Sequence, residues 1–283
     1  MFGIIDKLRC TWGIMGASWR VLKKDRELLL FPLLSGICCL LVLASFAIPL
    51  FSTGYWEPPA QDASTSRQVA YYAILFLFYF ANYFVIVFFN SAIVACAVIR
   101  LQGGDPTVSD GLHASVSRLP QIFGWALVSA TVSLILRIIE DRSSRAAQII
   151  AGILGMAWSM VTFLVVPVMV VEKAGPVEGV KRSTSLLRQT WGEQLMGNFS
   201  FGLIFALLGI PGVAIVVLGI ASGSALVTGI CVTLGVLYLI ALSLVSSALD
   251  AIFRAAVYLY AHEGEVAPQF GEGLMQSVLQ PRS

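Results

Sequence analysis

Residues 28–51 read LLLFPLLSGICCLLVLASFAIPLF, a stretch without a single charged side chain. A transmembrane α-helix needs about 20 consecutive apolar residues, and this stretch supplies them. The composition agrees, because 58% of the 283 residues are hydrophobic and only 12% are charged, against about 25% charged in ordinary soluble domains. With a mean hydropathy of +0.85 and a net charge of +2, the chain has too few polar side chains to cover a water-facing surface. The sequence therefore predicts an integral membrane protein.

Apolar windows recur along the whole chain, at about 28–50, 69–99, 120–139, 147–171, 195–220 and 225–261. They predict an all-α polytopic bundle of six transmembrane helices, with no separate soluble domain. The second and sixth windows exceed the length needed to cross hydrocarbon, so we expect these helices to tilt or to project beyond the bilayer. In the fifth window, Gly202, Gly209 and Gly212 should allow close approach of another helix.

Residues 1–27 are interrupted by charges too early to form a span or the continuous apolar core of a signal peptide. Their apolar residues recur in steps of three and four, which places them on one stripe of a helix: Phe2, Ile5, Leu8, Trp12, Met15, Trp19 and Leu22. We expect this helix to lie in the membrane interface, with the lipid-interface residues Trp12, Trp19, Lys23 and Lys24. The alternative is a helix that packs on the protein's own loops.

The distribution of Lys and Arg predicts the orientation. Of the 18 such residues, six lie in the N-terminal segment, two in the connector 100–118, four in the connector 172–193 and two in the C-terminal end, which leaves four for the opposite side. Both termini are therefore expected in the cytoplasm, with residues 263–283 as a short tail. Arg137, Arg142 and Arg145 lie on the expected outer side, against this rule. The third and fourth windows could therefore form a hairpin that does not fully cross the membrane.

The connectors on the expected cytoplasmic side share a pattern of glycine, proline and a short helical stretch, with a weaker third copy after the sixth window. We expect the first connector helix over about 106–118, with Pro106 at the first helical position, where the missing N–H costs nothing. Asp105 can cap this helix, and Thr107 with Asp110 resembles a capping box.

The second connector helix is expected over about 176–191, with Pro176 at its first position. Apolar and hydroxyl side chains recur there at helical spacing: Val177, Val180, Thr184, Leu187 and Trp191. This pattern predicts a second amphipathic helix in the membrane plane. Its candidate lipid-interface residues are Lys181, Arg182 and Trp191.

Four stretches carry a resemblance to a known family: SWRVLKKDRELLLFPLLSG, GGDPTVSDGL, IFGWALVSATV and EKAGPVEGVKRSTSLLRQTWGEQLMGNF. Together they resemble an uncharacterised prokaryotic family of six-span membrane proteins, a domain of unknown function. More distantly, KRSTSLLRQTWGE is similar to a connector in the membrane domain attached to some glycerophosphodiester phosphodiesterases. Since the phosphodiesterase domain itself is absent, no activity can be carried over, and the resemblance implies an integral membrane protein of a prokaryotic plasma membrane and nothing about mechanism.

Signals for an enzyme are missing from the sequence. HExxH, GxSxG, Walker A and GxGxxG motifs do not occur, and the two histidines, His113 and His262, lie on separate segments. The five cysteines form no CxxC pair, and their odd number supports neither a disulfide framework nor a zinc site. We therefore expect no enzymatic activity, no cofactor, no bound metal and no nucleic-acid partner.

Polar side chains inside the spans are the remaining functional candidates: Asn82, Asn90, Arg137, Asp250 and Arg254. The acid-before-base spacing of i and i+4 favours an ion pair between the last two, either to neutralise each other near the interface or to line a polar cavity. The two amides are expected to bond across to a neighbouring helix, rather than to line a permeation path. Arg137 lies near a span end and can extend toward headgroups.

These patterns favour a non-enzymatic protein that binds lipid or organises the membrane through in-plane helices. Its expected partners are membrane lipids, chiefly anionic headgroups, with a protein partner or a homo-oligomer left open. The alternative is a transporter or channel for a small solute or lipid, which requires a water-accessible cavity reaching the polar candidates. A third interpretation, an intramembrane lipid enzyme, requires a second reactive residue close to Asp250.

Overall fold

A computed structural model describes residues 4–53, 64–141, 145–191, 201–264 and 270. The structure is 91% helical, without strands in these ranges. Six of its described helical stretches are long and apolar enough to cross a membrane: 26–51, 65–101, 119–140, 145–172, 204–221 and 225–263. They confirm the predicted all-α polytopic bundle, and each overlaps one predicted window.

The chain divides into two compact units, each described here by itself. Unit 1 comprises Met1–Pro32, Ala97–Asp105 and Gln189–Ser283, and unit 2 comprises Leu33–Cys96 and Pro106–Arg188. Two long helices belong partly to each unit: α2 (Leu30–Thr53) and α3 (Thr65–Leu101).

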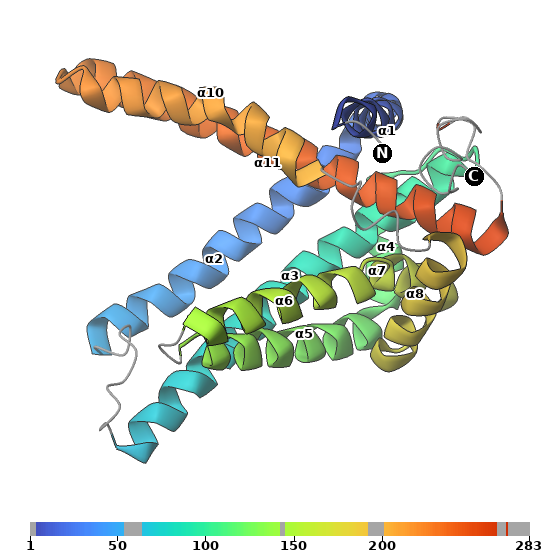
Figure 1. Cartoon of the computed structure of the whole chain (residues 1–283), viewed down its shortest axis with the longest axis horizontal. Coiled ribbons are helices and arrows are strands. Elements are labelled where there is room, and N and C mark those ends of the chain that lie inside the picture. Colours follow the sequence, from blue (N-terminus) through green and yellow to red (C-terminus); the bar gives the residue numbers. More distant parts are fainter. Residues whose placement is uncertain (1–3, 54–63, 142–144, 192–200, 265–269, 271–283) are drawn as a thin grey trace. The chain divides into compact units, whose positions relative to one another are not determined.

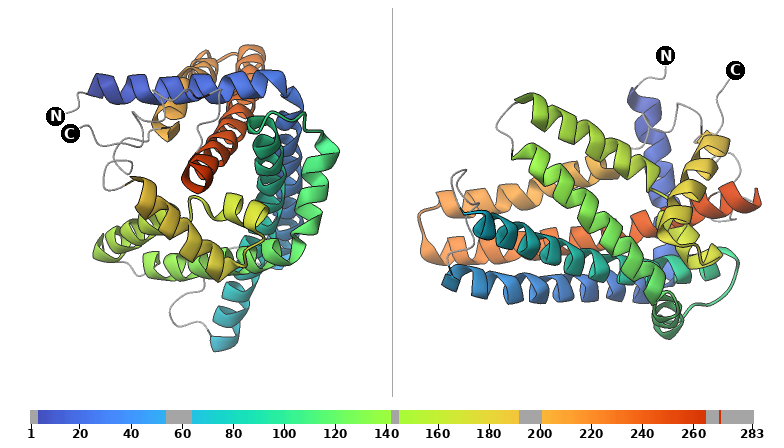
Figure 2. Two further views of the ribbon diagram at one scale, coloured as in Figure 1. Left: turned by 90° about the vertical axis from the view of Figure 1, so that its right-hand side faces the viewer. Right: turned by 90° about the horizontal axis from the view of Figure 1, so that it is seen from below.

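In unit 1, the antiparallel helices α10 (Phe201–Ala221) and α11 (Ala225–Glu263) form a hairpin and lie side by side in every view (Figures 1 and 2). Small residues hold them together. A Cβ built on Gly235 would lie 2.4 Å from Val216 Cγ2, and one built on Gly212 would lie 2.6 Å from the Tyr238 ring. The predicted close approach is therefore present at Gly212, whereas Gly202 has nothing within 4 Å.

The far half of α11 carries the core of unit 1. Its residues from Ala248 to Leu259 are almost all buried, whereas large side chains nearer the hairpin turn, such as Leu226 and Leu234, are exposed. Two shorter elements pack on the buried half, namely α1 (Ile4–Lys24) and the 3₁₀ helix η1 (Arg26–Leu29). Figure 2 shows that α1 lies across α11 rather than alongside it.

Unit 2 contains the rest of α2 and α3 together with five further helices: α4 (Val108–Ser117), α5 (Leu119–Glu140), α6 (Arg145–Val161), α7 (Val165–Glu172) and α8 (Pro176–Trp191), the last of which ends three residues into unit 1. Helices α5 and α6 form a second hairpin (Figure 1), in which the indoles of Trp125 and Trp158 stack with centroids 5.7 Å apart. Helix α5 is long enough to cross, at 22 residues or about 33 Å.

The fourth span is broken, because α6 ends at Val161 and α7 begins at Val165. Ser183 of α8 bridges the break: its Oγ accepts the Leu164 N–H at 3.2 Å and donates to the Val161 carbonyl at 2.8 Å. Ser183 and Leu164 are both fully buried. The connector helix therefore supplies the hydrogen bonds that the interrupted helix cannot make internally.

The starts of the two connector helices follow local capping chemistry. Thr107 and Asp110 form the predicted capping box, which makes Thr107 the N-cap and Val108 the first residue of α4. Pro106 therefore lies ahead of the helix, and the position predicted for it was wrong, because the reciprocal bonds of the box begin the helix after Thr107. Helix α8 does begin at Pro176, as predicted.

Candidate membrane-interface site

Helix α1 has two different apolar sides. Its buried side consists of Ala17, Ser18, Val21 and Leu22, each at most 2% exposed, on the helix that packs against α11 and η1. Trp12 and Trp19 are 63% and 41% exposed. At about 100° per residue, they lie more than a third of a turn from the centre of the buried side. The side chains of the first three members of the predicted stripe, Phe2, Ile5 and Leu8, lie outside the described part.

This geometry changes the prediction for the N-terminal stripe. Leu22 joins the protein core, whereas Trp12 and Trp19 do not, so the seven residues do not form one uniform contact surface. Small residues made the second face hard to recognise, since Ala17 and Ser18 add little to an apolar pattern. One side of this helix packs on the protein, on α11 and η1 rather than on loops, and another side is exposed. Its contact with the membrane interface stays a prediction.

Basic side chains border the exposed tryptophans. Lys23 and Lys24 are both exposed, and the Lys23 Nζ lies 5.7 Å from the centroid of the Trp19 ring, within range of a cation–π contact. Around α1 the order is thus a buried side, a tryptophan side and a lysine edge. A helix in a headgroup layer needs this order, since indole rings favour the interface and lysines extend toward phosphate. We call Trp12, Trp19, Lys23 and Lys24 the α1 face.

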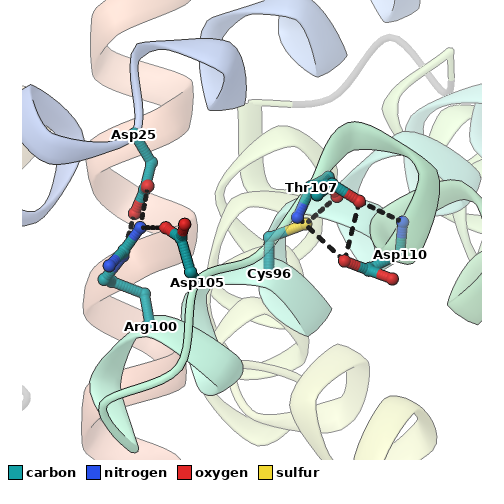
Figure 3. A network of polar contacts seen from close by, with 6 residues as sticks. All are labelled: Asp25, Cys96, Arg100, Asp105, Thr107 and Asp110. Atoms are coloured by element: carbon teal, nitrogen blue, oxygen red, sulfur yellow. Dashed lines mark hydrogen bonds and ion pairs between the residues drawn. The ribbon is translucent and has the colours of Figure 1, made fainter.

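The end of α1 is anchored by an ion-pair cluster that sequence reasoning missed (Figure 3). Arg100, at the end of α3, donates from Nε and Nη2 to the carboxylate of Asp25, which follows α1, and from Nη2 also to Asp105. The side chains of Asp25 and Arg100 are 8% and 16% exposed, whereas that of Asp105 is 91% exposed. Asp105 therefore forms an ion pair with Arg100 in this cluster, whereas the sequence suggested that it caps α4. A charged residue directly beside a span was the only available signal.

In unit 2, α8 repeats the arrangement of α1. Its buried side is formed by Gly179, Ser183 and Leu186, and a Cβ on Gly179 would lie 3.3 Å from Val165. The predicted stripe lies about a third of a turn away, and its first residue, Val177, is 67% exposed. Lys181 is exposed beyond this stripe.

Two further candidates on α8 have different outcomes. Arg182 Nε lies 3.1 Å from both carboxylate oxygens of Glu172, so this cation is held by the end of α7. Trp191 is the last residue of α8, but its side chain lies outside the described part.

The first connector carries a titratable cap on the right of Figure 3. Asp110 Oδ2 accepts the Thr107 hydroxyl at 2.7 Å and the Thr107 N–H at 2.9 Å. These two hydrogen bonds hold the pKa of Asp110 below its usual value of 3.8, because they favour the charged carboxylate.

The amide candidates inside the spans lie on α3. Asn82 Nδ2 donates to the Phe78 carbonyl of the same helix at 2.8 Å, instead of to a neighbouring helix. The expected bond between helices is made next to it, where Tyr83 Oη and Ser133 Oγ lie 2.6 Å apart. Asn90 is half-buried on α3.

The charged candidates inside the spans form local ion pairs. Arg254 Nη2 lies 2.8 Å from Asp250 Oδ2, so the pair predicted from the i,i+4 spacing is present. Arg137 is paired at the end of α5, with Nε 3.3 Å from Asp141 Oδ1 and Nη1 3.9 Å from Glu140 Oε2. Within the described residues, no three His, Cys, Asp or Glu side chains gather in a way that could hold a metal ion.

The six apolar helices and their packed connectors define the class of this molecule: an α-helical, multi-pass membrane protein. The chain belongs to a family of unknown function, DUF6159, whose model matches residues 69–268. This match covers spans two to six and both connectors, in agreement with the resemblance seen in the sequence. None of the curated proteins compared with the chain matches it.

Proposed function

We propose that this protein binds the phospholipid headgroup layer through the α1 face, and that it organises lipid or a partner at the membrane surface without catalysing a reaction. The observation that carries the proposal is the exposure of Trp12 and Trp19 on a helix whose opposite side is buried against α11. A helix held by one side on a membrane-crossing hairpin presents its other side at a constant position. One side of α1 thus contacts the protein, and the other is available to the headgroup layer.

The orientation of α1 supports the same function. Helix α11 is 39 residues long, about 58 Å, roughly twice the thickness of the hydrocarbon core. Helix α1 lies across it (Figure 2). A helix that crosses a membrane-spanning helix runs in the plane of the bilayer, which is the orientation of interfacial helices.

The charges set the expected lipid preference. Each Lys or Arg near an anionic surface contributes about 1 kcal/mol, so Lys23 and Lys24 together favour an anionic bilayer roughly thirtyfold over a neutral one. The excess of Lys and Arg on the expected side of the termini supports a position of α1 at the cytoplasmic leaflet of a prokaryotic plasma membrane.

Spin labelling of the full chain in nanodiscs tests this proposal. In a variant without the five native cysteines, labels at Trp12→Cys and at Arg20→Cys are compared for collisions with oxygen and with a water-soluble nickel reagent. We expect the label at position 12 to meet oxygen and the label at position 20 to meet nickel, since position 20 lies on the lysine edge. Nickel access at position 12 equal to that at position 20, in both anionic and neutral nanodiscs, would refute headgroup binding.

The transport alternative has a different requirement, namely a polar, water-filled cavity at the candidates inside the spans. The pocket described between α2 and α3 is lined by apolar side chains and one tyrosine, and the charged candidates are paired locally. These features support a lipid-facing role over a solute path. The distant similarity of the α8 connector to a phosphodiesterase-linked membrane domain stays a prediction and adds no activity.

A further inference from the structure

A pocket in unit 2 lies well away in sequence from the α1 face. It has a volume of about 250 Å³ and lies between α2 and α3, near the ends of these helices that flank residues 54–63. Its walls are Leu43, Phe46 and Phe51 on α2 and Tyr71, Ile74 and Phe78 on α3. The rings of Phe46 and Phe78 meet edge to face, with centroids 5.6 Å apart.

The size and position of the pocket match a hydrocarbon chain. An apolar cavity of about 150 Å³ accommodates benzene, so 250 Å³ has room for a longer apolar segment. Along α2 the walls run from Leu43 to Phe51, about 12 Å of helix axis, close to the roughly 15 Å of hydrocarbon in one leaflet. Both helices cross the bilayer by length and composition. The medium that meets the pocket is therefore acyl chain.

One residue of the pocket wall, Tyr71, lies within electrostatic range of two charged residues at the end of α5, Arg137 and Asp141. Arg137 has carboxylates at its Nε and Nη1 atoms, from Asp141 and Glu140, and among the described residues the two N–H groups of Nη2 make no ion pair. The cluster thus combines one cation with two anions. A headgroup that carries both a phosphate and an ammonium complements it, because the phosphate accepts from Arg137 and the ammonium meets the carboxylates.

We propose that this pocket binds one zwitterionic phospholipid from the leaflet opposite the termini, with an acyl chain between α2 and α3 and the headgroup on Arg137, Glu140 and Asp141. An anionic lipid lacks the ammonium and meets two carboxylates beside a single guanidinium, so it binds more weakly. The site shares no residue with the α1 face, and either one can fail without the other.

Native mass spectrometry of the full chain in mild detergent, titrated with phosphatidylethanolamine or phosphatidylglycerol, tests the proposal. We expect one phosphatidylethanolamine to be retained per chain. Ala47, which also lines the pocket, gives the decisive variant: Ala47→Trp fills the space and should abolish retention. The matched control is Ala44→Trp, an exposed position on the same helix, which should retain the lipid. If Ala47→Trp does not fold, Ala47→Leu makes the same comparison with a smaller side chain.

The headgroup contacts are tested separately with Arg137→Gln. Loss of an exposed charge contact corresponds to about 1 kcal/mol, or about fivefold in affinity. We expect this loss for phosphatidylethanolamine and a smaller change for phosphatidylglycerol, with Arg145→Gln as the control at another exposed arginine. Equal retention by Ala47→Trp and Ala44→Trp would overturn the site. Conversion of a dimer to a monomer by Ala47→Trp would also overturn it, because a second copy would then be the occupant.

Discussion

Replacement of Ser183 by alanine should destabilise the protein more than the same replacement of its neighbour Thr184. The Ser183 hydroxyl makes two hydrogen bonds across the break between α6 and α7, at 3.2 Å to the Leu164 N–H and 2.8 Å to the Val161 carbonyl. Both Ser183 and Leu164 are fully buried, so water cannot replace the lost partner. A buried donor left without a partner costs about 1–3 kcal/mol, and loss of the second bond adds about 1 kcal/mol.

The matched control is Thr184→Ala on the same helix. Its hydroxyl donates only to the Val180 carbonyl of its own helix, at 2.8 Å, so its removal should cost less than about 1 kcal/mol. Unfolding of the full chain in detergent is followed by circular dichroism. A difference of about 2–3 kcal/mol between the variants corresponds to roughly 4–12 °C in Tm. Hydrogen exchange should show faster exchange of the Leu164 amide in Ser183→Ala alone. Equal Tm values for the two variants would refute the bridging role.

Three other outcomes follow from the remaining contacts. Arg100→Gln leaves the buried Asp25 carboxylate without its cation and should cost about 3 kcal/mol; the double variant with Asp25→Asn should recover part of this in the same unfolding assay. Gly235→Leu should destabilise the α10–α11 hairpin by about 1–3 kcal/mol or more, because its Cβ would lie 3.0 Å from the Gly212 carbonyl oxygen, whereas Gly229→Leu, with nothing within 4 Å, should leave Tm unchanged. Since the pKa of Asp110 is lowered from 3.8, its contribution to the capping box is complete above pH 3.8 and is lost as the pH falls through the lower, folded-state pKa. Amide exchange at the start of α4 should show this loss, and Asp110→Asn should remove the pH dependence.

Local patterns predicted most of the helical architecture. Each of the six predicted apolar windows overlaps an observed helix, because a run of apolar residues long enough to cross hydrocarbon has few other stable conformations in lipid. The capping box at Thr107 was recognisable because both of its partners lie within three residues of each other. The Asp250–Arg254 pair was recognisable for the same reason, since its spacing follows from the helix repeat.

Such local patterns could not predict contacts between residues that are distant in sequence. Asp25 and Arg100 are 75 residues apart, and Ser183 lies 19 residues from Leu164. Ser183 stands in the hydroxyl run Ser183-Thr184-Ser185, and nothing in that run indicates which of the three bridges a broken helix. The stripe on α1 shows the same difficulty, because periodicity identifies an apolar side but not the partner of each side.

The sequence by itself determined that this chain crosses a membrane six times as helices, and that the second connector helix begins at Pro176. The tertiary structure decided which side of α1 is buried, which small residues form the seam between α10 and α11, and which polar groups complete the broken fourth span. The physical reason is the range of the interactions. Burial in hydrocarbon and helix capping act on neighbouring residues, whereas steric fit and buried hydrogen bonds depend on segments that only folding brings together.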